Sequence, residues 1–247
     1  MKKPNKLVII PTYNEVQNID ALLTQLSYLN LDVLFVDDGS NDGTIAKIES
    51  FASTNFEIHI LKRSKKMGLG TAYIAGYNWG LIRGYEYLMQ MDADGSHQVS
   101  DLARMIECID SNPELDLVIG SRWVAGGMTT NWDKKRELLS RSANVYTKTL
   151  LRYRISDSTS GFRIYKTGLI SKMNIDDIKS AGFGFQIEMT QKAIKSGAVI
   201  EEVPINFVER EFGQSKMSTH IIFEALLRVT ILGLIQFSSI FDNFWPL

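Results

Sequence analysis

Residues 85–97 read YEYLMQMDADGSH, a largely apolar run that gives way to two aspartates and a glycine. A short run with apolar side chains toward both sides is typical of a strand buried on both faces, as in a parallel sheet. Asp, Gly and Ser directly after it are typical of a turn. The stretch therefore predicts an inner strand with a polar loop at its carboxyl end.

Other short apolar runs end in polar turns in the same way, and helical patterns lie between them. This alternation predicts an α/β fold, with a mostly parallel sheet and helices on both of its faces. In such sheets ligands bind outside the carboxyl ends of the strands, so we expect the polar turns to line one crevice. The predicted strands are LVII (7–10), DVLFVD (32–37), EIHILK (57–62), YEYLMQMD (85–92) and DLVIGS (116–121), and the helices lie within 19–29, 44–52, 70–84 and 99–110.

The second half of the chain is less regular. Its patterns predict helices over 134–151 and 185–196, a short strand over 161–166 and one long strand over 199–209. No Pro/Ser-rich linker or charge block divides the chain. We expect one domain up to residue 217, followed by an apolar helical appendage, and the two predicted units are 1–217 and 218–247.

The composition is that of an ordinary globular protein, with 247 residues, 45% of them hydrophobic and 22% charged. The formal net charge of −1 gives no reason to expect a nucleic-acid partner. Cys108 is the single cysteine, which excludes an intramolecular disulfide and fits a reducing compartment. It lies in a helical pattern, where a small apolar residue is a better interpretation than a nucleophile. The apolar run 7–10 is too short for a signal peptide.

Asp92 and Asp94 are the first candidates for chemistry. In an extended chain, side chains two positions apart leave on the same side. Two such carboxylates repel each other unless a cation or a proton lies between them. Oxygen ligands suit Mg²⁺ or Mn²⁺, with substrate phosphates completing the coordination shell. We expect a divalent metal here, although DADGS taken alone also fits a surface turn with solvated aspartates.

Several competing motifs can be tested against the sequence. A calcium-binding EF-hand loop starting at Asp92 would require Gly at His97 and Glu at Ala103, so it fails. The run GLGTAY (68–73) lacks the third glycine of a dinucleotide fingerprint, and no Gly-Lys-Ser/Thr follows it. A haloacid-dehalogenase-like phosphatase also carries Asp-x-Asp after an apolar strand, normally the first strand of its chain. That alternative stays open from the residues alone.

Basic residues form a second group of candidates, because guanidinium groups bind phosphate oxygens bidentately. We favour function over solvated surface charge for Arg122, Arg136 and Arg210, since each lies near a predicted strand end or polar loop. Ser140 follows Arg136 by one helical turn. The other members of the basic set are Arg141, Arg163 and Lys216.

Seven motifs appear in an order that resembles the family-2 glycosyltransferases of GT-A fold, and within them the dolichol-phosphate and polyprenol-phosphate mannosyltransferases. The similarity extends from about residue 7 to 228, and the ordered set is far more specific than any one motif. The motifs are PTYNE (11–15), VDDGSNDGT (36–44), GLGTAYIAG (68–76), MDADGSH (91–97), GSRWVAGG (120–127), SDSTSGFR (156–163) and VEREFGQSK (208–216).

The resemblance implies a role for each candidate. Asp92 and Asp94 would bind Mg²⁺ or Mn²⁺ under the donor diphosphate, and Asp94 and Arg122 are predicted to be catalytic. Many members of the family have Gln where this chain has Ser96, so a third protein ligand is in doubt. The remaining assignments are donor-nucleotide binding by Pro11, Tyr13, Glu15, Asp38, Arg210 and Lys216, and acceptor-phosphate binding by Arg122, Arg136 and Ser140.

The implied reaction is transfer of mannose from GDP-mannose to a polyprenyl phosphate with inversion, giving polyprenyl phosphate β-mannose and GDP. A phosphate monoester is already anionic at neutral pH, so its attack needs little general-base help. Another donor such as UDP-glucose stays open, as does a module that binds the nucleotide without turnover. The implied location is cytoplasmic, peripheral at the cytoplasmic face of a membrane, with a membrane-anchoring partner left unknown.

The C-terminal segment bears on that location. Ser218 is a suitable N-cap for a last helix, on which Glu224 and Arg228 have the i,i+4 spacing of an ion pair. Residues 221–241 are too interrupted by charge to span a bilayer but apolar enough to lie in its interface. A last helix packed on the domain is an equally good interpretation. The interfacial anchors would be Phe237, Phe241, Phe244 and Trp245.

Overall fold

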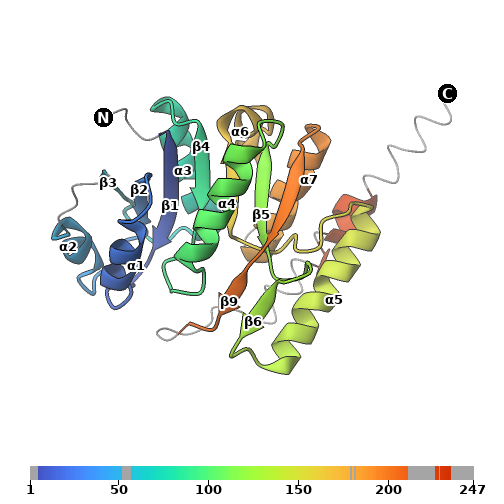
Figure 1. The fold of residues 1–247 in the computed structure, drawn as a ribbon, viewed down its shortest axis with the longest axis horizontal. Helices are drawn as coiled ribbons and strands as arrows, with labels where there is room; N and C mark the ends of the chain where they lie inside the picture. Colours follow the sequence, from blue (N-terminus) through green and yellow to red (C-terminus); the bar gives the residue numbers. More distant parts are fainter. Residues whose placement is uncertain are drawn as a thin grey trace.

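A computed structural model describes residues 5–51, 57–178, 180, 182–210, 226–227 and 229–234. Its centre is a seven-stranded sheet in which the strand order is β3-β2-β1-β4-β7-β5-β8 (Figure 1). All neighbouring strands are parallel except at β7, which runs antiparallel to both β4 and β5. The strands are β1 (Lys6–Thr12), β2 (Asp32–Asp37), β3 (Ile58–Lys62), β4 (Tyr87–Gln90), β5 (Leu117–Ser121), β7 (Arg163–Lys166) and β8 (Ile200–Pro204).

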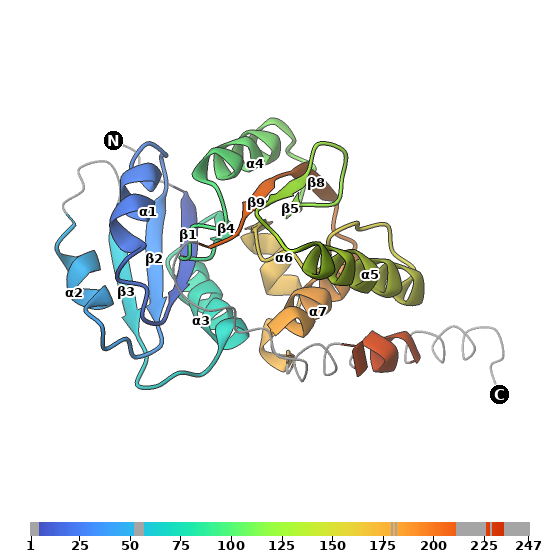
Figure 2. The same ribbon diagram turned by 90° about the horizontal axis from the view of Figure 1, so that it is seen from below.

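Helices cover both faces of this sheet, as predicted (Figure 2). Successive strand residues point to opposite faces, so Val8 and Ile10 pack with one set of helices and Leu7 and Ile9 with the other. The first face is covered by α1 (Ile19–Leu26), α2 (Thr44–Glu49) and α4 (Val99–Ser111), and the second by α3 (Leu69–Ile82), α6 (Thr167–Lys172) and α7 (Gly182–Lys195), with a 3₁₀ turn η1 (Ile175–Asp177) after α6.

Gly76, the last residue of GLGTAYIAG, and Gly80, one turn further along, let α3 approach the sheet closely. A Cβ atom at Gly76 would lie 2.4 Å from Ile9 Cγ2, and one at Gly80 would lie 2.4 Å from Leu88 Cδ2. Contacts of that length do not occur between carbon atoms, so any larger residue would push α3 away from β1 and β4. Close packing of α3 on the sheet therefore requires glycine at both positions, independent of any ligand.

The prediction of one long strand over 199–209 is wrong. The chain instead breaks into β8 and β9 (Asn206–Val208), which belong to different sheets. Pro204 has no N–H to continue the ladder, and Ile205 buries its side chain and donates its N–H to Ser121 O (3.1 Å). β9 then pairs in parallel with β6 (Met128–Thr130), a short strand that the sequence pattern did not indicate.

Helix α5 (Lys134–Leu151) has the predicted bounds and forms one outer edge of the molecule (Figure 1). Asp133 caps it by accepting the N–H of Lys135. Residues 226–227 and 229–234 are helical and lie alongside α5, where Val229 is buried and Tyr146 and Thr230 share a hydrogen bond of 2.8 Å. Among the described residues no helix is both long and apolar enough to cross a membrane. Ser218, the Glu224–Arg228 pair and the four aromatic anchors lie outside the described residues.

Candidate active site

A cavity of about 980 Å³ opens at the carboxyl ends of β1, β2, β4 and β5 and continues along α5. Its position is that expected for a ligand site in an α/β sheet. Lys216 lies outside the described residues. All of the other predicted site residues line the cavity: Pro11, Tyr13, Glu15, Asp38, Asp92, Asp94, Arg122, Arg136, Ser140 and Arg210.

At one end of the cavity, the loops after β1 and β2 are tied together by hydrogen bonds. Asp37 is fully buried and accepts bonds from Thr12 Oγ1 (2.9 Å), the N–H groups of Gly39 and Ser40, and Ser40 Oγ (2.6 Å). Asn14, with a left-handed φ of 59°, accepts the N–H of Asn41 through its side chain. Of the two aspartates in VDD, Asp37 thus holds the loops together, and Asp38 lines the cavity.

Asp38 has the loop after β3 as its partner. Its Oδ2 accepts the N–H groups of Met67 (3.0 Å) and Gly68 (3.2 Å), and its Oδ1 lies 3.1 Å from Arg63 Nη1. In the same region the ammonium of Lys66 lies 4.3 Å from the centroid of the Tyr13 ring, a cation–π arrangement. Lys66 lines the cavity and was missed from the sequence, although it lies only two residues before Gly68, the first glycine of the GLG motif.

The two central carboxylates lie in the turn after β4, since that strand ends at Gln90 and not at Asp92 as predicted. Asp92 is half-buried, and its Oδ1 accepts Tyr73 Oη (3.0 Å). Asp94 is buried; its Oδ1 accepts both Ser96 Oγ (2.6 Å) and Ser96 N (3.1 Å), and its Oδ2 faces Arg210 Nη1 at 3.2 Å. Ser96 therefore orients Asp94 within the turn.

Their surroundings shift the two acids in opposite directions. Burial raises the pKa of Asp92 above its ordinary value, and the nearby charge of Asp94 raises it further. Burial would also raise the pKa of Asp94, but the hydrogen bond from Ser96 and the charge of Arg210 hold that pKa below its usual range. Such a pair is stabilised in its fully ionised form by any added positive charge.

His97 accepts a backbone hydrogen bond from this turn and was not among the predicted residues. Its Nδ1 accepts the N–H of Asp92 (3.0 Å), which requires a neutral ring with the proton on Nε2. The ring stacks on Phe162 with centroids 4.5 Å apart and meets Phe207 edge-on at 5.3 Å. Burial lowers the pKa of His97, in agreement with a neutral imidazole. Its role in the structure is to hold the Asp92 backbone.

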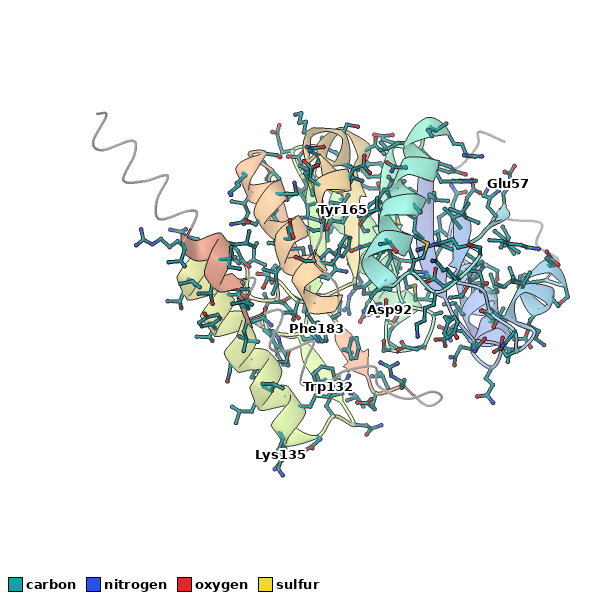
Figure 3. All side chains as sticks on the ribbon, turned by 180° about the vertical axis from the view of Figure 1, so that it is seen from behind. Glu57, Asp92, Trp132, Lys135, Tyr165 and Phe183 are labelled. Carbon is teal, nitrogen blue, oxygen red and sulfur yellow. The ribbon has the colours of Figure 1, made fainter. Side chains whose placement is uncertain are left out.

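The donor set of this turn fits a hard divalent cation. Two carboxylates share one polar cavity, and the guanidinium of Arg210 shows that the position beside Asp94 Oδ2 accepts positive charge. Asp32, Glu57 and His59 also lie close enough together to hold a metal ion. That group sits at the opposite end of the sheet, where Asp32 already accepts Glu57 N (2.9 Å) and Tyr85 Oη (2.7 Å). Figure 3 shows Glu57 far from Asp92, so this second group takes no part in the cavity.

Arg122 is buried in an ion pair that crosses from β5 to the loop before β7. Its Nε and Nη2 donate to the two oxygens of Asp157 (2.7 Å each), and its backbone N–H donates to the same carboxylate. Thr159 Oγ1 accepts a further bond from Nη2 (2.9 Å). The charge of Arg122 holds the pKa of Asp157 below its usual range against the effect of burial. Asp157 lies in the quoted SDSTSGFR motif, but its partner could not be identified from sequence.

Arg136 and Ser140 face the cavity from one side of α5. Arg136 forms an ion pair with Glu209, which directly precedes Arg210, and its guanidinium lies 4.1 Å from the centroid of the Trp132 ring. Its Nε is buried without a hydrogen-bond partner among the described residues. Figure 3 shows Trp132 and Phe183 on the same side of the molecule as Asp92. Arg122 and Arg136, which we call the cationic wall, thus line the same cavity as the turn that carries Asp92 and Asp94.

Beyond Ser140 the cavity wall becomes apolar. Leu139, Ala143 and Tyr146 of α5 face Ile187 of α7 and Val229 of the C-terminal helical segment. The two remaining members of the basic set lie elsewhere: Arg141 is exposed and paired with Glu137 (2.8 Å), and Arg163 is fully buried against the carbonyls of Ser158 and Ser160. Neither lines the cavity.

A mostly parallel sheet with an Asp-x-Asp pair in a strand-end loop that lines a cavity is the arrangement expected of the glycosyltransferases of GT-A fold. Residues 7–173 match the model of glycosyl transferase family 2, and the chain belongs to this family. The protein is therefore a glycosyltransferase, which removes the phosphatase alternative.

Two relatives resemble this chain over nearly its whole length. The undecaprenyl-phosphate mannosyltransferase of Micrococcus luteus is 45% identical over 92% of this chain and 93% of its own. The polyprenol monophosphomannose synthase of Mycolicibacterium smegmatis is 44% identical over 92% of this chain and 86% of its own.

Solved structures share the fold at lower identity. Glucosyl-3-phosphoglycerate synthase from Mycobacterium tuberculosis, in complex with Mn²⁺, UDP and glucosyl-3-phosphoglycerate, has a TM-score of 0.62 at 16% identity, over 95% of this chain and 80% of its own. A mannosyltransferase from Pyrobaculum calidifontis, in complex with GDP-mannose and Mn²⁺, has a TM-score of 0.58 at 15% identity, over 94% and 70%. At such identities the likeness concerns the fold alone.

Proposed function

We propose that the protein transfers mannose from GDP-mannose to a polyprenyl phosphate, forming polyprenyl phosphate β-mannose and GDP. The observation that carries this proposal is one continuous cavity with three parts: polar loops at one end, an acidic pair in the middle, and a cationic wall that turns apolar at the other end. Those parts suit a nucleotide, a diphosphate and a lipid phosphate in that order. The names of the two close relatives support the choice of sugar and acceptor.

On the donor side, Pro11, Tyr13, Glu15 and Asp38 contact the guanosine in this proposal. Asp92 and Asp94 hold Mg²⁺ or Mn²⁺, which when bound neutralises charge on the donor diphosphate. Tyr73 and Ser96 fix the directions of the two carboxylates through the bonds described above. Arg210 forms an ion pair with Asp94. In this proposal its guanidinium also binds a diphosphate held at the same turn.

On the acceptor side, Arg122, Arg136 and Ser140 bind the phosphate. A phosphate monoester has a second pKa of about 6, so its oxygen is a competent nucleophile at neutral pH without a general base. The task of the chain is then to align that oxygen with the anomeric carbon. A single displacement inverts the configuration, which converts an α-linked donor into a β-linked product. Arg122 is well suited to alignment because Asp157 fixes its guanidinium.

The location proposed for the protein follows from the acceptor, whose long prenyl chain stays in a bilayer. We propose a cytoplasmic protein that works peripherally at the cytoplasmic face of a membrane.

The test is an assay with radiolabelled GDP-mannose, polyprenyl phosphate and Mg²⁺ or Mn²⁺. We expect a mannolipid that is labile to mild acid, with no product when EDTA is added or when the lipid is left out. UDP-glucose supplied in place of GDP-mannose serves as the donor control. Glucolipid formed faster than mannolipid would overturn the donor assignment, and release of free mannose without lipid would overturn the acceptor assignment.

A further inference from the structure

Gln186 brings a buried side-chain amide to the cavity. It lies near the start of α7, is 2% exposed and lines the cavity. Neither its Oε1 nor its Nε2 has a hydrogen-bond partner among the described residues. Buried amides are almost always hydrogen-bonded, because an unmade bond inside a protein is costly. The wall of the cavity therefore presents a donor group and an acceptor atom that the described part of the chain does not use.

Packing contacts fix the start of α7 beside Asp92. The ring of Phe185 stacks on the ring of Tyr73 with centroids 6.3 Å apart, and Tyr73 donates its hydroxyl to Asp92. Gly70 leaves room for this stack, since a Cβ atom there would lie 2.8 Å from Phe185 Cδ2. Gln186 directly follows Phe185 on the helix, so its backbone has a fixed position close to the centre of the cavity.

The strand order places this amide between Asp92 and Arg122. β4, which leads to Asp92, pairs with β7, and β5, which leads to Arg122, lies on the other side of β7. Because β7 is antiparallel to both, the loop before it lies at the edge where β4 and β5 end. Gly161 belongs to that loop, and a Cβ atom there would lie 3.5 Å from Gln186 Nε2 and 3.9 Å from His97 Cε1.

The sugar is the part of the substrate that fits this position. In the proposed reaction the diphosphate lies at Asp92 and the acceptor phosphate at Arg122, and the transferred hexose has to lie between the two. Each hydroxyl of a hexose both donates and accepts, so neighbouring hydroxyls can satisfy both halves of a carboxamide. Ionised phosphate oxygens only accept, and a phosphate would leave Oε1 of Gln186 without a donor.

We propose that the side-chain amide of Gln186 binds hydroxyl groups of the transferred hexose and thereby selects the donor sugar. The inference rests on the proposed function for the order of the groups along the cavity, but it does not depend on which sugar nucleotide is the donor. Two neighbouring hydroxyls are engaged elsewhere: Thr159 Oγ1 accepts a bond from Arg122, and Ser160 Oγ donates to a backbone carbonyl (2.6 Å). A donor that lacks the matching hydroxyl leaves the amide buried without a partner, which is how polar sites reject such substrates.

Gln186→Met tests the proposal, because it replaces the amide by an apolar group of similar size. We expect kcat/KM for GDP-mannose to fall about tenfold to a hundredfold, which corresponds to the loss of about two neutral hydrogen bonds. The affinity for GDP, measured by calorimetry with Mg²⁺ or Mn²⁺, should change by less than about twofold, since GDP has no hexose to contact the amide. Equal losses for GDP and for GDP-mannose would overturn the proposal.

The stability of the same variant separates a binding role from a structural one. Replacing a buried amide that has no partner by an apolar group removes an unfavourable term from the folded protein. Gln186→Met should therefore unfold at the same urea concentration as the unaltered protein or at a higher one. A lower midpoint with unchanged kcat/KM for GDP-mannose would overturn the proposal and make Gln186 a structural residue.

Gln191→Met is the matched control on the same helix. Gln191 is 5% exposed, and its Nε2 also has no partner among the described residues, but it does not line the cavity. This variant should keep the kinetic constants of the unaltered protein. A loss as large as that of Gln186→Met would contradict the proposal, because any buried amide of α7 would then have the same effect.

Gly161→Ala provides a second probe of the same space. Its Cβ would enter between Gln186 and His97 at ordinary contact distances, so the variant should fold normally. It should lower kcat/KM for GDP-mannose by narrowing the space for the hexose and leave the affinity for GDP unchanged. Full activity toward GDP-mannose would show that the hexose does not use this space.

Deoxy analogues of the donor test the contact itself. Removal of the hydroxyl that Gln186 binds should lower kcat/KM of the unaltered protein about fivefold to tenfold, but that of Gln186→Met by less than about twofold. The analogues that lack each of the other hydroxyls should be affected equally in both proteins. Equal effects in both proteins for every hydroxyl of the hexose would overturn the proposal.

The donor comparison described under the proposed function comes first, so that the two proposals fail separately. If the protein transfers glucose from UDP-glucose, the proposed donor is wrong, and the same variants are measured with UDP, UDP-glucose and its deoxy analogues. A loss confined to the sugar nucleotide and to one hydroxyl would then still support the role of Gln186. An equal loss for UDP and UDP-glucose would overturn it.

Discussion

Asp37 and Asp157 are both fully buried carboxylates beside the same cavity, but they are held in different ways. Asp37 accepts bonds from uncharged donors, three of them within three residues of it along the chain. Asp157 is neutralised by Arg122, which is 35 residues away in sequence. The two ends of the cavity differ less sharply, because at the predicted donor end Asp38 also has distant partners, namely Arg63 and the N–H groups of Met67 and Gly68. The bonds from Gly39 and Ser40 to Asp37 are set by that loop's own sequence, whereas the Arg122–Asp157 and Arg136–Glu209 ion pairs form only when distant segments meet.

The largest loss of activity is expected from changes to Asp92 and Asp94, which lie between the predicted donor end and acceptor end of the cavity. Asp92→Ala or Asp94→Ala should lower the rate of transfer about a thousandfold or more, since several kcal/mol of charge stabilisation by the metal would be lost. Asp20→Ala, which alters an exposed ion pair with Lys47, is the control and should keep full activity. Measured turnover in the presence of EDTA would contradict the metal assignment.

The acceptor end should depend on its buried ion pair for stability. Asp157→Ala leaves the charge of Arg122 buried without its partner and should lower the free energy of unfolding by about 3–5 kcal/mol. The pKa of Asp157 is lowered in the folded protein, so its contribution is complete above its unfolded pKa of about 3.9 and is lost as the pH falls through the folded value. Urea titrations between pH 7 and pH 2.5 measure both effects. A variant as stable as the unaltered protein at pH 7 would show that the pair contributes nothing.

The donor end should respond less to loss of its buried carboxylate. Asp37→Asn keeps the shape of the side chain but replaces one acceptor oxygen by a donor group, so some of the four bonds are lost. We expect a loss of about 1–3 kcal/mol in the free energy of unfolding, the range for an unsatisfied buried group. Thermal unfolding of Asp37→Asn beside Asp157→Ala compares the two ends in one experiment. A larger loss at Asp37 would reverse the contrast.

The smallest effect is expected at Glu209. A phosphate that binds Arg136 competes with the Glu209 carboxylate, and both side chains of that pair are partly exposed. Glu209→Gln should therefore lower the KM for the acceptor by about twofold to fivefold, in line with the weakness of partly exposed ion pairs. The KM for GDP-mannose should not change. A higher acceptor KM would mean that Glu209 orients Arg136 for phosphate binding.

Much of the fold was predictable because its signals are local. The apolar runs that end in polar turns predicted β1 to β5, and the bounds of α5 agree with the prediction. The break at Ile205 and the pairing of β6 with β9 were not predictable, because they depend on which distant strand each half of 199–209 meets. The ion-pair partners could not be predicted for the same reason, because nothing near Arg122 or Arg136 in the sequence indicates Asp157 or Glu209. His97 stood inside a quoted motif, yet only the structure shows that it holds the backbone of Asp92.

A two-substrate kinetic comparison of Tyr13→Ala with Arg136→Ala tests the division of the cavity most directly. Tyr13→Ala should raise the KM for GDP-mannose and leave the KM for polyprenyl phosphate unchanged, whereas Arg136→Ala should raise only the KM for polyprenyl phosphate. If both variants raised the same constant, or each raised the other one, the assignment of a donor end and an acceptor end to this cavity would be wrong.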